Sequence, residues 1–406
     1  MKHTIIAITA LLCSIGAKAY NADQCQGSLG PYPANVVQVT YPDSLKPVFI
    51  NHLGRHGSRY PASAYSATTM RKALLKADSL KSITKLGKRF LGVINEVMAR
   101  SNGQWGQLDS TGIAEHRGIA RRMAAAFPQL FNGGRVLSGA SKSPRAIMSM
   151  YSFTHELSLH AKDITLIELS GKSLDETLRP FDVNSNYKKY MADKPWKSIY
   201  DSYVDSVAPT AVSRLLGKTY PATRAELQQL SIIEYYNIAN LKAMGMANDY
   251  APYLTLDEYN RLWSCFNLRQ YFQHTQSEVS TVPSDISAPL LNEIVESTEQ
   301  AAQGLSTTTA LLRFAHAETV LPLVSLMRLP GCSYTGHDLG NLKQHWTDFS
   351  VVPMAANLQV VLCKAPSGKH YALVLLNEKL VAPIHGDSRT VVPWNELRDY
   401  WLSLDK

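Results

Sequence analysis

The feature that most constrains the fold is an alternation of short apolar runs with amphipathic segments, interrupted once by a long stretch without strand patterns. The runs that we predict as strands lie at residues 48–53, 135–139, 164–169, 309–314, 358–363 and 371–376. The segments between and after them that we predict as helices lie at residues 67–99, 112–127, 144–160, 319–327 and 394–402. Strands alternating with helices predict an α/β domain with a central, mostly parallel sheet flanked by helices.

Between residues 172 and 300 the strand-like runs disappear. Tyrosine, alanine and leucine recur there at helical spacing, as in residues 227–246 and 256–272. We interpret this stretch, residues 172–300, as an inserted α-helical cap domain. The α/β domain is then made of residues 20–171 and 301–406, which come together from the two sides of the insertion.

Residues 1–19 resemble a secretory signal peptide. Lys2 gives a basic start, an apolar core follows over residues 5–15, and Ala17-Lys18-Ala19 has the form of a cleavage site. The apolar core is too short to cross a membrane as a helix. We therefore expect cleavage near Ala19, export to the periplasm or out of the cell, and no stable membrane anchor.

Four cysteines follow the predicted leader, namely Cys25, Cys265, Cys332 and Cys363. An even number of cysteines in an exported protein suggests disulfides, and these spacings are not those of a metal site. We expect one or two bridges, with the pairing left open.

The charge of the chain sets only a weak limit on its partners. The formal net charge is +8, of which Lys2 and Lys18 contribute two positive charges from the predicted leader. This balance fits an anionic ligand without specifying one. The lysines and arginines are dispersed, with no basic run and no zinc-finger spacing, so we expect no nucleic-acid partner.

The most informative local sequence follows the first predicted strand and reads Arg55-His56-Gly57-Ser58-Arg59-Tyr60-Pro61. Two guanidiniums oppose a positive charge on His56, so its imidazole should stay neutral and nucleophilic. The same guanidiniums suit a phosphate, whose oxygens they bind in a planar fork. Gly57 allows the backbone to approach a ligand closely. The motif predicts a histidine nucleophile in an arginine-lined phosphate pocket; the alternative is a solvated basic turn.

A second turn, containing His316 and Glu318, follows the predicted strand 309–314. Ligands of α/β sheets bind at the carboxyl ends of the strands, so we expect both turns to line one site. The Glu318 carboxyl can protonate a leaving-group oxygen and later activate a water, while His316 can donate to a phosphoryl oxygen. The alternatives are an acid favoured by the helix dipole and a satisfied buried histidine. Arg145, which follows the second predicted strand, is either a third guanidinium on the same phosphate or a solvated side chain.

Together these residues resemble the histidine acid phosphatase branch of the histidine phosphatase superfamily. The stretch from Arg55 to Pro61 matches its Arg-His-Gly-x-Arg-x-Pro signature. His316-Ala317-Glu318 is similar to the His-Ala-Glu of the multiple inositol polyphosphate phosphatases, and it departs from the His-Asp of fungal and enteric phytases. Weaker likenesses extend over most of the chain, at residues 108–112, where Asp109 stands in place of the family's threonine, and at residues 178–182 and 353–358.

The resemblance implies a role for each matching residue. His56 would be the nucleophile and become a phosphohistidine, and Glu318 would protonate the leaving alcohol and then activate water. The transferring phosphate would be bound by Arg55, Arg59, Arg145 and His316. Phosphoryl transfer mainly needs positioning and charge stabilisation, so this agrees with the chemistry read from the residues. The resemblance implies no metal and no other cofactor, because the arginines occupy the place that Mg²⁺ takes elsewhere.

The implied substrates are inositol hexakisphosphate and lower inositol polyphosphates. A ligand with so many negative charges needs further cations around the reacting phosphate, and the candidates are Lys142, Arg179, Lys188 and Lys189. A broad-specificity acid phosphatase acting on small phosphomonoesters would share every catalytic residue. A non-catalytic binder of polyphosphates is the alternative from another functional class, and a phosphoglycerate mutase fits an export signal less well.

Overall fold

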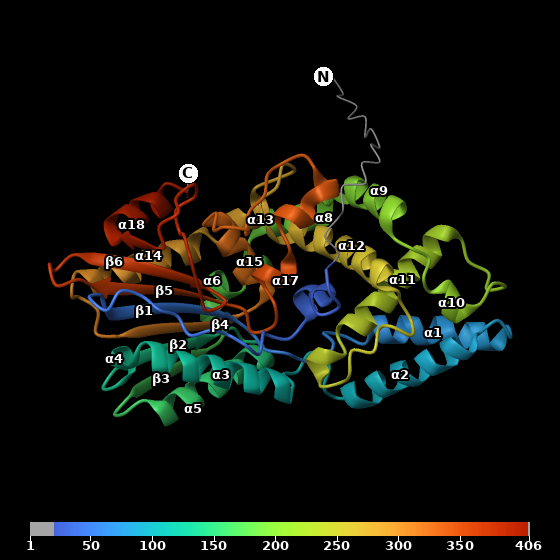
Figure 1. Ribbon diagram of the computed structural model, residues 1–406, viewed down its shortest axis with the longest axis horizontal. Coiled ribbons are helices and arrows are strands. Elements are labelled where there is room, and N and C mark those ends of the chain that lie inside the picture. Colours follow the sequence, from blue (N-terminus) through green and yellow to red (C-terminus); the bar gives the residue numbers. More distant parts are fainter. Residues whose placement is uncertain (1–19, 405–406) are drawn as a thin grey trace, which may run out of the picture.

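The computed structural model describes residues 20–404 (Figure 1). The predicted leader, residues 1–19, lies outside the described part. None of the helices within residues 20–404 has both the length and the apolar character that crossing a membrane requires.

Eight strands form one sheet in the order β3-β2-β4-β1-β5-β6-β7, and β8 pairs with β6. The strands β3, β2, β4 and β1 are parallel neighbours, whereas β5 to β8 add antiparallel pairings beside β1. The predicted α/β sheet is therefore confirmed, with its parallel strands forming one half. The strands are β1 (Lys46–Arg55), β2 (Arg135–Ala140), β3 (Thr165–Ser170), β4 (Ala310–Ala315), β5 (Asn357–Lys364), β6 (His370–Leu376), β7 (Lys379–Val381) and β8 (Val391–Pro393).

The side chains of the strands alternate between two hydrophobic layers. In β5, Leu358, Val360 and Leu362 pack into one layer, and Val361 and Cys363 pack into the other. This period of two is what a strand buried on both faces produces. One face is covered by α3 (Ser110–Ala126), α4 (Pro128–Phe131) and α5 (Pro144–His160), and the other by α6 (Asp175–Leu178), α14 (Ala288–Ala302), α15 (Ala317–Leu326) and α18 (Trp394–Leu402) (Figure 1).

A helical region with its own hydrophobic core lies beside the sheet (Figure 1). Its main helices are α1 (Tyr65–Ser79), α2 (Lys85–Ser101), α9 (Lys197–Val207), α10 (Ser213–Leu216), α11 (Arg224–Ala239) and α12 (Leu256–His274). Five short α-helices are also present: α7 (Pro180–Val183), α8 (Ser185–Asp193), α13 (Val282–Asp285), α16 (Leu342–His345) and α17 (Asp348–Val351). Four 3₁₀ helices complete the described chain, at Gln24–Leu29, Lys172–Leu174, Lys242–Met244 and Leu339–Asn341. The core of this region thus includes α1 and α2, which precede residue 172 in the chain. The cap boundaries at residues 172 and 300 stay a prediction.

The segment that the sequence predicts as helical, residues 67–99, is divided into two helices, α1 and α2. Lys81 has a φ of 57°, in the left-handed region that a helix cannot contain. The Thr84 side chain then accepts a hydrogen bond from the Gly87 backbone N–H at 3.0 Å and begins α2. A turn signal without glycine or proline is difficult to recognise from sequence.

The prediction of one or two disulfide bridges is wrong. Cys25, Cys265, Cys332 and Cys363 are all buried and free. Cys332 and Cys363 lie in the two different layers on either side of the sheet, and the other two lie in the core of the helical region. Each thiol is thus part of a hydrophobic core, where an unoxidised cysteine packs as a small apolar side chain.

Candidate active site

The carboxyl ends of three parallel strands meet at one edge of the sheet. Arg55 at the end of β1 is in register with Ala315 at the end of β4, and the His56 backbone N–H donates to the Ala315 carbonyl at 3.0 Å. On the other side of β4, the Ser141 N–H after β2 donates to the Phe314 carbonyl at 3.0 Å. Backbone pairing therefore brings together turns that are far apart in the sequence.

The turn after β1 is held tightly against the start of α3. A Cβ on Gly57 would lie 2.6 Å from the Gly112 Cα, so only glycine fits this approach. The Glu115 carboxylate accepts the backbone N–H and the hydroxyl of Ser58, each at 2.7 Å. Asp109 begins α3 by accepting the Thr111 N–H at 2.9 Å. Asp109 thus does the capping that a threonine at this position would also do.

His56 is buried, and its two ring nitrogens have different roles. Nδ1 lies 3.0 Å from the Gly57 carbonyl oxygen, which can only accept, so Nδ1 carries the proton. Nε2 is left with a free lone pair. Burial, followed by the charges of Arg145, Arg55 and Arg59, holds the pKa of His56 well below its ordinary value of 6.5. The imidazole is therefore neutral at physiological pH, as a nucleophile must be.

Three guanidiniums surround this imidazole, with donors left over. The Arg55 Nη1 donates to the carbonyls of Ser28 and Val352, each at 2.6 Å, and the Arg59 Nη1 donates to the Tyr60 carbonyl at 2.9 Å. The buried Nε–H groups of Arg55, Arg59 and Arg145 have no hydrogen-bond partner among the described residues. Unpaired buried donors are costly, so a cluster of three indicates a site for an anion.

The charge of these guanidiniums survives their burial. Desolvation and mutual repulsion lower the pKa of Arg55 to about 10 and the pKa of Arg59 to about 9, both above neutrality. None of the three arginines forms an ion pair within residues 20–404, so their charge is available to a ligand.

His316 lies beside His56, with the ring centroids 5.5 Å apart. Its Nε2 is 2.8 Å from both the Ser141 hydroxyl and the Arg179 Nη1, and its Nδ1 is 3.3 Å from the Arg145 Nη2. Burial, followed by the nearby arginines, lowers the pKa of His316 to about 3, so the ring is neutral. A neutral imidazole accepts at one nitrogen only, so the two guanidiniums cannot both donate to it. One of them keeps a donor for an anion.

Glu318 lies in the first turn of α15, partly exposed to the site. Burial alone would raise the pKa of this carboxyl, but His274, His316 and Arg55 outweigh burial and lower it to about 2. Among these neighbours Glu318 is therefore a carboxylate at neutral pH. Negative charge placed beside this carboxyl would raise its pKa and favour its protonated form.

The helical region supplies residues that the sequence analysis missed. His274 at the end of α12 is buried, with its Nδ1 3.2 Å from the Tyr187 hydroxyl. Burial lowers the pKa of His274 to about 4, although Glu318 acts in the opposite direction. Arg269, on the same helix, lies over the Tyr236 ring and has a buried Nε without a hydrogen-bond partner among residues 20–404. Helical spacing predicted the helix but carried no signal that its end would face the strand ends.

The four further predicted cations lie in different surroundings. Arg179 reaches the site through His316, stacks over the Phe181 ring at 4.9 Å and pairs with Asp182. Lys142 follows Ser141 but its Nζ is 2.6 Å from an Asp175 carboxylate oxygen. Lys188 and Lys189 are exposed on α8, and Lys189 pairs with Asp193. The structure thus brings Arg179 to the site, while a contribution from Lys142, Lys188 or Lys189 stays a prediction.

No cluster of histidine, cysteine and carboxylate side chains suited to a metal occurs within residues 20–404. The site is instead built from three guanidiniums, two neutral imidazoles and one carboxylate. That set can bind a tetrahedral anion, attack its central atom and exchange a proton with a leaving oxygen.

Comparisons with known proteins agree with this geometry. The family model for the histidine phosphatase superfamily (branch 2) matches residues 48–377. Human multiple inositol polyphosphate phosphatase 1 is 25% identical over 396 residues, which cover 88% of this chain and 79% of the relative. The same-named protein of Gallus gallus is 24% identical and covers 93% and 85%, respectively.

Two solved structures show that the fold is shared. The multiple inositol polyphosphate phosphatase of Bifidobacterium longum, in complex with inositol hexasulfate, superposes with a TM-score of 0.77 at 19% identity, covering 94% of this chain and 98% of that one. The phytase from D. castellii gives a TM-score of 0.75 at 17% identity, covering 95% and 86%.

Proposed function

Since this chain belongs to the histidine phosphatase superfamily (branch 2), we propose that it hydrolyses inositol hexakisphosphate and lower inositol polyphosphates through a phosphohistidine at His56. The observation that carries the proposal is the neutral His56, with Nε2 free, among three guanidiniums whose Nε–H groups have no hydrogen-bond partner in the described part of the chain. A phosphate supplies acceptors for those donors and an electrophile for that nitrogen.

In the first half-reaction the Nε2 lone pair of His56 attacks phosphorus. The bond between phosphorus and the inositol oxygen breaks, and the leaving oxygen takes the proton of Glu318 as it departs. Arg55, Arg59 and Arg145 neutralise the charge on the non-bridging oxygens. The products are an inositol with one phosphate fewer, a phosphohistidine and the Glu318 carboxylate.

In the second half-reaction the Glu318 carboxylate takes a proton from a water whose oxygen attacks phosphorus. The nitrogen–phosphorus bond breaks and its electron pair returns to His56. Inorganic phosphate leaves and Glu318 is protonated again, so one residue acts first as acid and then as base.

Binding of a polyphosphate substrate would also favour the protonated form of Glu318, which is the form that can donate a proton. The pKa of Glu318 is low, and at neutral pH the positive groups that act on this carboxyl are the guanidiniums of Arg55, Arg59 and Arg145. Several substrate phosphates in the same space supply negative charge, which raises that pKa and favours the protonated carboxyl. A monophosphate brings less charge and would prepare the acid less well.

The choice of inositol polyphosphates as substrates is supported by the names of the curated relatives and by the inositol hexasulfate bound to the B. longum protein. Within this chain, Arg179 adds a further guanidinium beside His316.

Product analysis from inositol hexakisphosphate over time tests the proposal. We expect lower inositol phosphates to appear in sequence, with kcat/KM at least about tenfold higher than for a sugar monophosphate. Arg179→Gln should lower kcat/KM for the hexakisphosphate more than for the monophosphate. Equal kcat/KM for both substrates would indicate a broad-specificity acid phosphatase, and binding without turnover would indicate a non-catalytic polyphosphate binder.

Export is part of the proposal and has its own test. The support for it is the sequence pattern of residues 1–19. When the whole chain is expressed in a bacterial host, we expect the mature protein to begin at Tyr20 and to be found outside the cytoplasm. Mass spectrometry of the amino terminus in each cell fraction measures both, and an intact Met1 in the cytoplasmic fraction would refute export.

A further inference from the structure

The positive charge of the chain is concentrated in one short hairpin. Residues 71–89 contain seven basic residues and one acidic residue, a net charge of +6. The whole chain has a net charge of +8, and Lys2 and Lys18 of the predicted leader account for the rest. The remainder of the chain after the leader is thus neutral overall. In the sequence these charges are interleaved with apolar residues and look dispersed, but folding brings them onto one surface.

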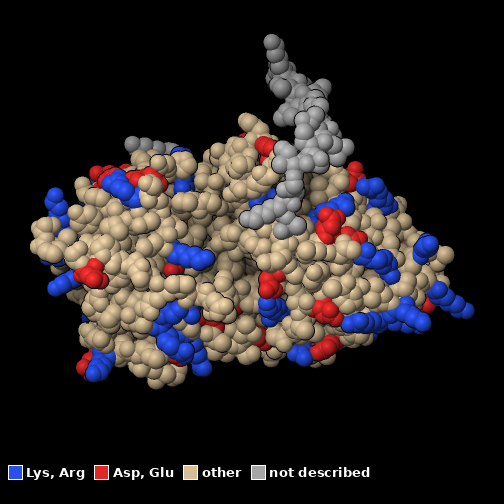
Figure 2. All heavy atoms as spheres, viewed as in Figure 1, with Lys and Arg blue, Asp and Glu red and all other residues tan. Residues whose placement is uncertain are grey.

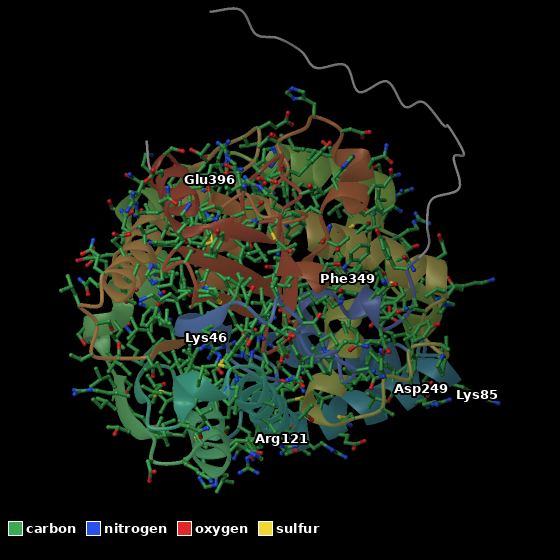
Figure 3. The ribbon with its side chains drawn as sticks, turned by 60° about the vertical axis from the view of Figure 1, so that its left-hand side comes forward. Lys46, Lys85, Arg121, Asp249, Phe349 and Glu396 are labelled. Atoms are coloured by element: carbon green, nitrogen blue, oxygen red, sulfur yellow. The ribbon has the colours of Figure 1, made fainter. Side chains whose placement is uncertain are left out.

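This surface, which we call the basic tip, is formed by the end of α1, the beginning of α2 and the turn between them. All seven of its basic residues are exposed: Arg71, Lys72, Lys76, Lys81, Lys85, Lys88 and Arg89. In Figure 2 blue side chains line the lower right-hand edge of the molecule, and in Figure 3 the labelled Lys85 lies at its outer right-hand end.

Few acidic groups oppose this charge. Asp78 lies 3.6 Å from Lys88, and Asp249 lies 2.8 Å from Arg89. Lys72, Lys81 and Lys85 have no ion pair within the described chain. Lys218, on the neighbouring segment, is exposed as well and adds a further positive charge.

Two local features of the basic tip run against intrinsic residue preferences, although the N–H groups of Lys81 and Ser82 do close α1 on the carbonyls of Asp78 and Ala77. Lys81 has a φ of 57°, a conformation that glycine adopts without strain and lysine does not. Lys85 and Lys88 lie in the first turn of α2, which holds no acidic residue, although the helix dipole disfavours positive charge there. A lysine at a position that favours glycine, and two lysines in a first turn that favours acids, are choices of residue that a functional surface can account for.

Hydrogen bonds fix the basic tip against a neighbouring helix. The tip also lies far from the active site. The Thr84 N–H and hydroxyl bond to the backbone around Leu215, which fixes the turn against α10. The 15 residues of α1 carry the tip about 22 Å from the helix start that follows the active-site turn. The tip therefore cannot touch a phosphate bound at His56.

Two leucines among the lysines indicate the kind of partner. Leu75 is 40% exposed and Leu80, at the turn itself, is 48% exposed. Nucleic acids are recognised with arginine and stacking aromatic side chains, whereas five of these seven basic residues are lysines. A protruding surface of lysines with exposed leucines suits an interface where phosphate head groups lie above acyl chains.

We propose that the basic tip, with Leu75 and Leu80, docks the protein reversibly on membrane surfaces rich in anionic phospholipids. The lysines contact the phosphate head groups and the leucines enter the boundary with the acyl chains. The active site, on a different part of the molecule, stays open to substrate in solution.

Co-sedimentation with vesicles tests this docking. We expect the full mature chain to bind vesicles of phosphatidylcholine mixed with phosphatidylglycerol, and to bind pure phosphatidylcholine poorly. The triple variant K72Q/K81G/K85Q removes the three unpaired lysines and should bind the mixed vesicles about tenfold or more weakly. Lys81→Gly relieves the backbone strain there, so folding is not at risk from that change.

A matched control has the same net charge and a different location. K364Q/K369Q/K379Q neutralises three exposed lysines of the sheet region and should bind the mixed vesicles as the unchanged protein does. Turnover of a small phosphate ester should be the same for all three proteins, which shows that each is folded. Equal loss of vesicle binding in both triple variants would overturn the proposal.

Leu80→Ser separates a lipid surface from a soluble polyanion. It should weaken binding to mixed vesicles several-fold and leave binding to heparin or duplex DNA unchanged, because only a bilayer offers an apolar layer. If Leu80→Ser binds the vesicles as well as the unchanged protein, or if heparin binds more tightly than the vesicles at the same salt concentration, the partner is not a membrane.

Discussion

The turns after β1 and β4 occupy equivalent places at the ends of two neighbouring parallel strands, and they differ in charge. The first turn places Arg55 and Arg59 around His56, whereas the second places Glu318 at the start of a helix. The guanidiniums of Arg55, Arg59 and Arg145 act on both side chains, with opposite consequences for the proposed chemistry. They keep His56 neutral and ready to attack, and they keep Glu318 ionised and therefore unable to donate.

The two turns therefore differ in what the substrate must contribute before the reaction can begin. In the proposed mechanism, burial and fixed guanidiniums of the protein keep His56 neutral before substrate binds. The acid is prepared only when phosphate enters, because bound negative charge must offset the positive groups around Glu318. Variants of the two turns should therefore differ in how strongly their effects depend on the substrate.

The largest effect is expected at the first turn. His56→Ala removes the nucleophile, so kcat should fall about 10⁴-fold or more for every phosphate ester, whatever its leaving group. Binding of inorganic phosphate, measured by titration calorimetry, should stay close to normal because the three guanidiniums remain. His155→Ala, a change of an exposed histidine on α5, is the matched control. Normal turnover by His56→Ala would refute the phosphohistidine mechanism.

At the second turn the effect should depend on the leaving group. Glu318→Gln should slow hydrolysis of inositol phosphates about 10²- to 10⁴-fold, because an alkoxide leaves poorly without a proton. An activated aryl phosphate, whose phenolate leaves unaided, should be slowed far less. Glu296→Gln, on the exposed side of α14, should change neither rate. Equal slowing of the two substrates would remove the acid role from Glu318.

Sequence predicted the first of these turns better than the second, for a physical reason. The Arg55–Pro61 motif is contiguous, so its chemistry can be read locally, and the alternating strands and helices place it at a strand end. The surroundings of Glu318 are assembled by long-range packing, with His274 arriving from α12. Nothing within α12 marks that histidine as a neighbour of a carboxyl.

Other features of the fold could not be predicted from the sequence because they depend on strand pairing and packing. Period-two patterns identified β5 and β6, but pairing of β1 with β5 in the antiparallel sense is decided by the chain path between them. The cysteine count suggested bridges, whereas burial of Cys332 and Cys363 in different layers keeps them apart. Local composition indicates which residues are buried, but it does not indicate which buried residues contact one another.

The pH dependence of kcat/KM tests whether the guanidiniums of the first turn lower the pKa of His56. The nucleophile must be neutral, and its pKa lies well below 6.5, so activity should persist as the pH falls through 6.5. Arg59→Gln removes one opposing charge and should raise the pKa of His56, which moves the acid limb of kcat/KM to higher pH. Comparing variant and unchanged protein on one aryl phosphate cancels the ionisation of the substrate. Arg121→Gln, on the outer face of α3, should leave the limb in place, and an unmoved limb in Arg59→Gln would contradict the electrostatic account.

The smallest expected effects are on the free energy of unfolding, through the hydrogen bonds that hold each turn in place. Glu115→Ala should lower the free energy of unfolding by about 2–3 kcal/mol, because the Ser58 N–H, the Ser58 hydroxyl and the Tyr32 N–H all lose a charged acceptor. Thr319→Val, in the helix that follows the second turn, loses a single neutral bond from its hydroxyl to the Leu178 carbonyl and should lower it by about 1 kcal/mol. Urea unfolding measures both changes, and Glu115→Gln, which keeps an acceptor, should fall between them. A larger loss for Thr319→Val would mean that the second turn, and not the first, is the more firmly fixed of the two.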